Sequence, residues 1–475
     1  MKSLRSTPCL AALAVVAACA APPAPVPDAP ATGAEAFAAP AEAVPVEATW
    51  WSGFDDPVLT DLIEDALARN ASLKAADAAV DAVEIARRSA DLSRRVSTRT
   101  TTSAEVARGV QVNSEVSGQL SSALTASWEY DAFGRLRALV ESADFDIEAE
   151  RQARRDLAVI IASETALAYI DLRGAQVRLD VARRNAEAQK EGLDLIQTLL
   201  DNGRATQLDF ERADAQYRST LASLPVFEAQ IATAKNTIAA FVGIDATAPG
   251  AYFEPVRAAT DIPALSAPIA AGNPADLLRR RPDVRQAEAT LASRLALGEA
   301  ARADIFPRIT FNAAANAFYN DLDDFKTSKS IGFGIGPSLV WEGPDLRRVY
   351  ARIDQADAFS MQAAALYEQA VLDALADAES ALSDYALELE RRADLVIAAA
   401  AARRALDLAT LRFQEGLDDY LDVLDAQRTL LDAEDRLATS QAETASRAIR
   451  AYRALGGVWD DPALVDFRNS QTGGT

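Results

Sequence analysis

The chain of 475 residues contains no histidine, only two cysteines and only two methionines. Histidine is the commonest general base and the commonest neutral metal ligand, so its absence argues against most hydrolytic and metal-dependent chemistry. An enzyme could still use Asp, Glu or Ser, but no group of these residues has a catalytic pattern in the sequence. We therefore expect that the protein is not an enzyme and holds no metal and no other cofactor.

Positive charge is also scarce. The chain has 48 Lys and Arg against 70 Asp and Glu, which gives a formal net charge of −22. A nucleic-acid-binding surface needs the opposite balance, because contacts with phosphate depend on cations. The composition therefore argues against nucleic acid as a partner.

The N-terminus has the pattern of a secretory signal. Lys2 and Arg5 precede an apolar run over residues 9–18. This run is too short to span a bilayer as a helix, which needs ~20 residues. We predict a lipoprotein signal peptide over residues 1–18.

The end of this segment carries a lipidation motif. Val16-Ala17-Ala18-Cys19 resembles the lipobox of bacterial lipoproteins, in which the cysteine is acylated and becomes the first residue. We predict that Cys19 is lipidated and that residues 19–49, rich in Ala, Pro and Glu, form a disordered tether. The alternative is an ordinary signal that is cut near Ala21.

Beyond residue 49 the chain repeats itself at a distance of 213 positions, so that Trp128 recurs as Trp341. Earlier in each half the distance is 211, since Val80 falls opposite Leu291. A repeat of this length is too long for a solenoid unit and predicts two equivalent halves. The predicted divisions are a first repeat over 50–250, a Pro/Ala-rich linker over 251–273, a second repeat over 274–457 and a C-terminal tail over 458–475.

Each half begins with a helical period, over 57–91 and over 274–304, and then changes to strict alternation. The alternating segments have the length of tilted transmembrane strands, ~10 residues. A soluble hairpin is the alternative, but four strands cannot close a barrel and lipid does not tolerate open edges. A membrane barrel would therefore need several chains. The predicted strands are 95–107, 117–130, 308–319 and 331–341.

Aromatic residues lie near the strand ends, as in the girdles of membrane barrels (Trp128, Tyr130, Tyr319 and Trp341). Glu129 and Glu342 follow two of these residues directly. In a threefold assembly their copies would meet at the base of the barrel.

Very long helices follow each pair of strands. Residues 136–201 contain no proline, and 346–414 repeat this pattern. At 1.5 Å per residue each helix would span roughly 100 Å. Both end at a glycine, Gly203 or Gly416, after which a returning helix is predicted, so the pattern indicates antiparallel coiled-coil hairpins.

Three motifs resemble the TolC-like outer membrane factors, particularly their lipoprotein branch (the OprM/NodT type of RND efflux systems). They are the strand-to-helix junction at 127–137, the segment 278–288 that opens the second half, and the segment 421–427. The resemblance implies a mixed fold of long α-helical hairpins and a β-barrel. It implies a homotrimer in which each chain gives four strands to one twelve-stranded barrel and its helices to a periplasmic tunnel.

The resemblance also implies a function. We expect the outer-membrane channel component of a tripartite efflux pump, a passive duct for small molecules. Its partners would be a periplasmic adaptor, an inner-membrane RND-type pump and the lipid of the outer membrane. One alternative is the outlet of a type I protein secretion system, and another is a periplasmic coiled-coil scaffold without a pore.

A gate is implied near the start of the last long helix. Asp422 and Asp425 match the paired aspartates that line the narrowest point in the family. A spacing of three places both on one helical face, so three chains would bring six carboxylates to one axis and attract cations. Leu421 belongs to the same constriction, and Arg428 would latch it to a neighbouring helix. The alternative is that Asp422 caps its helix and Asp425 faces solvent.

The two helical tips are predicted to dock the adaptor. Gly203 and Gly416 end long helices at left-handed positions, and Arg204, Asp209 and Arg412 are close to them in sequence. In the family, adaptor hairpins fit between helical hairpins of this kind. The alternative is that both glycines are simple helix caps.

Overall fold

The computed structural model describes residues 37–38, 49–108, 116–257, 260–269, 271–319, 331–343 and 345–457. The predicted signal peptide, Cys19, most of the tether and the tail over 458–475 lie outside these residues. The chain divides into two compact units. The first contains Ala78–Gln152 and Gln286–Gln369, and the second contains Ala29–Asp77, Ala153–Arg285 and Ala370–Thr475.

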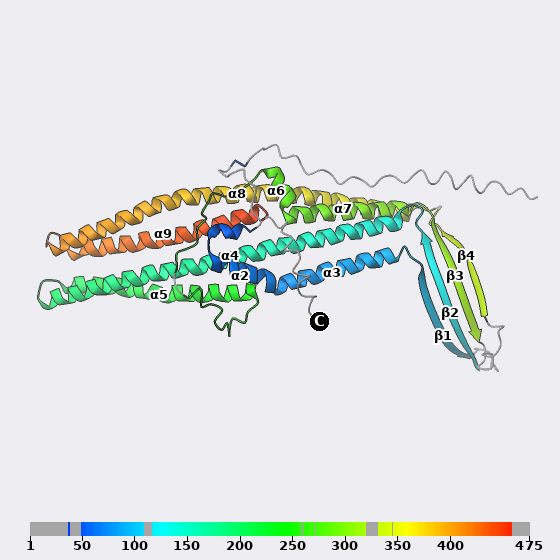
Figure 1. Cartoon of the computed structure of the whole chain (residues 1–475), viewed down its shortest axis with the longest axis horizontal. Helices are drawn as coiled ribbons and strands as arrows, with labels where there is room; N and C mark the ends of the chain where they lie inside the picture. The colour runs from blue at the N-terminus through cyan, green and yellow to red at the C-terminus, as the bar shows by residue number, and fades with distance from the viewer. Residues whose placement is uncertain are drawn as a thin grey trace, which may run out of the picture. The chain divides into compact units, whose positions relative to one another are not determined.

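The first unit contains one antiparallel sheet in the order β1-β2-β3-β4 (Figure 1). The strands β2 and β3 come from different halves of the chain, so their pairing joins the two repeats, with Trp128 opposite Phe311. The predicted strands began and ended within two residues of these bounds. The bounds are β1 Ser97–Arg108, β2 Val116–Tyr130, β3 Arg308–Tyr319 and β4 Ile331–Val340.

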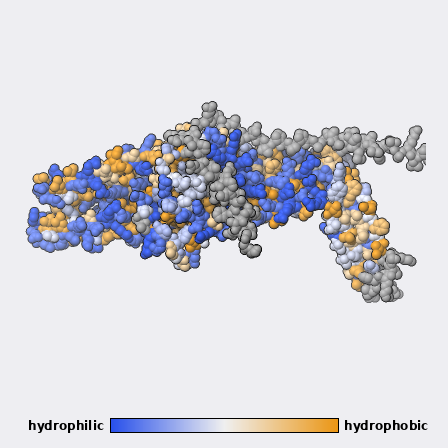
Figure 2. Space-filling model, viewed as in Figure 1, coloured by the Kyte–Doolittle hydropathy of each residue, from blue (hydrophilic) through white to orange (hydrophobic). Residues whose placement is uncertain are grey.

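The two faces of the sheet differ in chemistry. The register places Leu124, Ala315 and Phe333 side by side on one face, and Phe333 is 91% exposed. The other face carries small polar residues, where the Ser127 hydroxyl donates to Asn312 Oδ1 at 2.9 Å. Figure 2 shows apolar residues gathered over the strands. The sheet therefore exposes a large apolar surface within a single chain.

Parts of four helices complete the first unit: α3 (Ala71–Leu92), α4 (Arg135–Asp201), α7 (Pro282–Ala303) and α8 (Arg347–Gln414). Within this unit, polar contacts join neighbouring helices. These are Arg87–Asp144 at 2.8 Å, Arg151–Glu84 at 2.9 Å, Ser142–Ser293 at 3.0 Å and Arg302–Asp357 at 2.5 Å.

The second unit contains two long hairpins, in which α5 (Gln207–Val242) returns along α4 and α9 (Tyr420–Ala454) returns along α8 (Figure 1). It also holds the 3-10 turn η2 (Trp50–Phe54), α2 (Pro57–Arg69) and α6 (Pro274–Arg280). No helix in the described ranges is both long and apolar enough to cross a membrane. The largest fully buried side chains of this unit include Trp51, Leu59, Ile63, Tyr169, Ile170, Ile238, Leu277 and Ile449.

The prediction of one continuous helix at the start of each half is wrong. The first is broken at Asn70 and the second at Arg281, which lie 211 positions apart, the distance found for this part of the repeat. At the first break the Asn70 side chain accepts the N–H groups of Ser72 and Leu73, which caps α3. At the second break Pro282 disfavours helical backbone in the residue before it, and Arg281 has ψ 120°.

The residue at each break donates a hydrogen bond to the end of a returning helix. Asn70 Nδ2 donates to the carbonyl of Phe241 near the end of α5 at 2.8 Å. Arg281 Nη1 donates to the carbonyl of Ala454 at the end of α9 at 2.9 Å. Phe241 and Ala454 are 213 positions apart, so the two contacts are equivalent in the two halves and differ in the side chain that donates. We call the contacts Asn70–Phe241 and Arg281–Ala454 the two joints.

Candidate functional site at the strand–helix junctions and helix tips

The turns that lead into the strands are held by the two repeated tryptophans. Trp128 Nε1 donates to the carbonyl of Arg94 at 3.1 Å, and Trp341 Nε1 donates to the carbonyl of Ile305 at 3.0 Å. Each indole therefore fixes the helix-to-strand turn of its own half. These residues were predicted only as girdle aromatics, and the hydrogen bonds add a local structural role.

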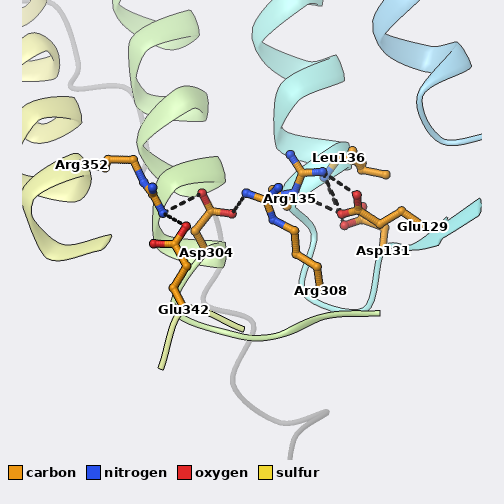
Figure 3. Close-up of polar contacts among 8 residues, drawn as sticks. All are labelled: Glu129, Asp131, Arg135, Leu136, Asp304, Arg308, Glu342 and Arg352. Atoms are coloured by element: carbon orange, nitrogen blue, oxygen red, sulfur yellow. Dashed lines mark hydrogen bonds and ion pairs between the residues drawn. The ribbon is translucent and has the colours of Figure 1, made fainter. Parts of the chain in front are cut away.

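Charged residues fix the opposite turn, where strands lead into helices (Figure 3). The Arg135 guanidinium donates to both carboxylate oxygens of Glu129 at 2.8 Å. Asp131 accepts the backbone N–H groups of Leu136 and Arg137, which satisfies the N-terminus of α4 and opposes its dipole. This junction is thus closed by one ion pair and one helix cap.

The second half has a related junction built from other residues. Arg352 pairs with Glu342 at 3.1 Å, and Arg308 pairs with Asp304 at 2.7 Å (Figure 3). Glu342 is the repeat mate of Glu129, and both therefore have an arginine of their own chain. The two glutamates are therefore not free carboxylates within their own chain, and their meeting at a threefold axis stays a prediction.

The two helical tips have the same backbone turn. Gly203 has φ 70° and Gly416 has φ 71°, and the N–H of the residue after each glycine bonds back across the turn. Arg204 N donates to the carbonyl of Leu199 at 2.8 Å, as Leu417 N does to the carbonyl of Arg412 at 2.9 Å. This is the Schellman arrangement, so both glycines cap helices. Their contact with a partner stays a prediction.

The charged residues at the tips differ in whether they form hydrogen bonds or ion pairs within their own turn. Asp209 forms a capping box with Thr206 at the start of α5, and these hydrogen bonds lower the pKa of Asp209. Arg412 pairs with Asp418 at 2.8 Å through Nη2, and this guanidinium lowers the pKa of Asp418. Arg204 is exposed. Two of the three predicted docking charges are therefore held within their turns.

The predicted gate residues share one face of α9. Leu421, Asp422, Asp425 and Arg428 are exposed, whereas Val423, Gln427 and Leu430 of the opposite face are buried. The N-cap of α9 is Asp419, so the alternative that Asp422 caps this helix is wrong. Among the described residues, neither the Asp422 nor the Asp425 carboxylate has a hydrogen bond or an ion pair. Arg428 likewise has no partner in the described part of this chain.

The whole arrangement is that of a duplicated channel subunit, with strands of transmembrane length and long helical hairpins. The chain belongs to the outer membrane efflux protein family, whose model matches residues 62–244 and 273–457. The first stretch falls within the first predicted repeat, and the second begins one residue before the second predicted repeat and ends with it. The predicted family, its efflux function and its place in the outer membrane are confirmed.

Curated relatives cover most of the chain. It is 30% identical over 426 residues to the probable efflux pump outer membrane protein SepC of Pseudomonas putida, covering 87% of this chain and 86% of that protein. It is 29% identical to the pyoverdine export outer membrane protein OpmQ of Pseudomonas aeruginosa, covering 86% and 87%. It is 27% identical to nodulation protein T of Rhizobium leguminosarum bv. viciae, covering 90% and 87%.

Solved structures share the fold. The outer-membrane channel OprN matches with a TM-score of 0.81 and 35% identity, covering 91% of this chain and 99% of that chain. CusC matches with a TM-score of 0.78 and 25% identity, covering 90% and 99%. The mostly helical fold with a four-stranded sheet is therefore that of the channel family.

Proposed function

We propose that three copies of this chain form one twelve-stranded barrel and a continuous duct through the outer membrane and the periplasm. The supporting observation is the sheet, whose order leaves β1 and β4 as unpaired edges. An open edge in lipid leaves backbone polar groups unsatisfied, so neighbouring copies would have to supply the missing strands. The apolar face would then meet lipid and the polar face would meet water.

The duct would be the outer-membrane part of a tripartite pump for small molecules and would not be an enzyme. Relatives named for toluene efflux and pyoverdine export support small compounds over secreted proteins. A periplasmic adaptor and an inner-membrane RND-type pump would be its partners. A scaffold without a pore does not explain an exposed apolar strand face such as that around Phe333 and Ile335.

The gate of this duct would lie at Asp422 and Asp425. Support comes from their position, because both carboxylates are exposed on one face of α9 and neither forms a hydrogen bond or an ion pair with another described residue. Leu421 would narrow the same constriction, and Arg428 would find its partner on a neighbouring copy. Six carboxylates around one axis would select cations and bind multivalent ones.

The adaptor would dock at the tip turns. Gly203 and Gly416 keep these turns compact, and Arg204 offers an exposed charge beside the first of them. Arg412 and Asp209 would mainly hold the turns in shape. Charge reversal at Arg204 should therefore lower drug resistance with unchanged trimer yield, whereas charge reversal at Arg412 should also loosen the tip.

The duct is tested with the purified protein. We expect a trimer that dissociates on heating in detergent and that conducts ions in a planar lipid bilayer. A monomeric protein, or a trimer without conductance, would contradict the proposal. A trimer that conducts but fails to restore drug resistance to a strain lacking its own channel would favour the protein-secretion outlet.

The proposed lipidation is tested separately. The intact mass of the mature protein should correspond to a chain that begins at an acylated Cys19. Cys19→Ser should lose the lipid and keep the trimer, because a single lipid anchor contributes only marginal membrane binding beside a barrel. An unmodified Cys19, or an N-terminus near Ala21, would favour the ordinary signal.

A further inference from the structure

The contact between α4 and α9 in the second unit changes character along its length. Far from the tip it is well paired: Arg178 donates to Asp435 at 2.7 Å, and Asn185 donates to Glu434 at 3.1 Å. At the tip it is apolar, where Ile196 packs in one cluster with residues of α9. Beside this cluster, and sharing Tyr420 with it, lie buried polar side chains without hydrogen-bond partners among the described residues.

These polar side chains come from both helices. Gln189 on α4 is 3% exposed, and Tyr420 and Gln427 on α9 are 6% and 8% exposed. Within the described residues, both amide atoms of Gln189, the Tyr420 hydroxyl and Gln427 Oε1 have no hydrogen-bond partner. Burial raises the pKa of the Tyr420 phenol to about 12, which agrees with a group removed from water.

A glycine on α4 permits this contact. A Cβ at Gly192 would lie 2.3 Å from the Tyr420 hydroxyl oxygen and 3.9 Å from Gln427 Nε2. Gly192 follows Gln189 by three positions, so both lie on the same face of α4. A side chain at position 192 would therefore displace the Tyr420 hydroxyl. We name Gln189, Gly192, Tyr420 and Gln427 the polar seam.

The polar seam opposes its own closure. A buried polar group that loses water without gaining a partner disfavours the closed arrangement, and separation of the helices would return the group to water. The adjacent apolar cluster, which includes Tyr420 and Val423 with Ile196, favours closure. At the start of α9, apolar packing against α4 therefore favours the contact and the buried polar groups disfavour it.

We propose that the polar seam is a built-in weak point that lets the first turns of α9 separate from α4 and thereby regulates the constriction at Asp422 and Asp425. Tyr420 and Gln427 lie on the buried face of α9, and the two aspartates lie on its exposed face within the same helical turns. A movement of this segment away from α4 therefore also moves the aspartates. This inference rests on the proposed function only for its effect on conduction.

Two opposite variants test the seam. Gln189→Leu combined with Gln427→Leu replaces the unpartnered amides by apolar groups of similar size, so it should stabilise the closed contact. Gly192→Ala adds a methyl group against the Tyr420 hydroxyl and should loosen the contact. Gln197→Leu is the matched control, because Gln197 is an exposed residue of the same helix.

The first measurement is backbone amide hydrogen exchange of residues 420–430 in the purified full-length protein. We expect the double Leu variant to exchange about tenfold more slowly than wild type, Gly192→Ala to exchange faster, and Gln197→Leu to match wild type. Unchanged or faster exchange in the double Leu variant would overturn the proposal, because it would show that water or another group already satisfies these atoms.

The second measurement is single-channel recording in planar bilayers. The double Leu variant should open less often than wild type, and Gly192→Ala should open more often. Equal open probabilities, together with the expected exchange rates, would show a weak seam that does not regulate conduction and would overturn the regulatory claim. Absence of conductance in wild type would instead contradict the proposed duct, and hydrogen exchange would still decide on the seam.

Discussion

The two tip turns share their backbone geometry, yet the residues that follow them differ in what they are free to do. After Gly203, Thr206 and Asp209 satisfy each other in a capping box. After Gly416 the repeat places Asp419 where Thr206 would be and Asp422 where Asp209 would be. Asp419 is the N-cap of α9, but its side chain makes no capping hydrogen bond, and the Asp422 carboxylate has no hydrogen bond to any described residue. The Asp209 carboxylate thus stabilises its helix start in the first half, whereas the equivalent Asp422 carboxylate stays without a hydrogen bond among the described residues.

The helix breaks show the same divergence. The two joints keep the hydrogen bond to the end of the returning helix, but Asn70 is neutral whereas Arg281 brings a buried positive charge. Arg281 also pairs with Asp283 at 2.6 Å and Asp377 at 3.4 Å. Duplication thus preserved a hydrogen bond to a backbone carbonyl at the end of the returning helix, while the side chain that donates this bond changed.

The largest expected effect is a difference in stability between variants of the two joints. Arg281→Ala should destabilise the protein by about 2–3 kcal/mol, because it removes a buried partner of two carboxylates and of a helix end. Asn70→Ala should cost only about 1 kcal/mol, through loss of a cap and one hydrogen bond. Thermal melting of the two variants measures the difference. Equal losses would show that the charge at Arg281 adds nothing to the joint.

A smaller loss of stability tests whether the two tip turns are equivalent. Gly203→Ala and Gly416→Ala should each cost about 1 kcal/mol, because an alanine is strained at positive φ. The two costs should agree, since no other atom lies within 4 Å of either added Cβ. Melting curves of the single variants provide the comparison. A clearly larger loss at one tip would mean that this tip contacts another part of the assembly.

The smallest effect concerns pH. The hydrogen bonds from Thr206 lower the folded-state pKa of Asp209 below its ordinary value of 3.8. This contribution to stability is present above the unfolded pKa and is lost as the pH falls through the lowered folded pKa. Thr206→Val should therefore lower the melting temperature slightly at pH 7 and have less effect as the pH falls through the lowered folded-state pKa of Asp209. A difference that does not depend on pH would contradict a role for the Asp209 charge.

Much of the fold could be predicted because it follows from local patterns. Proline-free stretches, the change from helical to alternating period and the repeated glycines were sufficient for the long helices, the strands and the tip turns. Asn70 is a preferred N-cap residue and could have revealed the first break, but its hydrogen bond to the carbonyl of Phe241, 171 positions away, could not be predicted. Pro282 could have revealed the second break, because proline disfavours helix in the preceding residue.

The site was predicted less completely. The sequence placed Asp422 and Asp425 on one face, and the structure adds that the capping role belongs to Asp419. The partners of Glu129 and Glu342 were missed because Arg135 and Arg352 lie at different spacings from them, six and ten positions. The role of Gly192 could not be predicted from the sequence, since the atom that an added Cβ would meet is the Tyr420 hydroxyl of another helix.

The most direct test of the proposed gate is single-channel recording of Asp422→Asn combined with Asp425→Asn, with Asp209→Asn as the matched control. We predict that the double variant folds normally, loses much of its preference for cations and is blocked by trivalent cations about tenfold less well, because six charges leave one axis. Asp209→Asn should conduct and block like wild type. A double variant that keeps wild-type selectivity and block would contradict the claim that these aspartates line the pore.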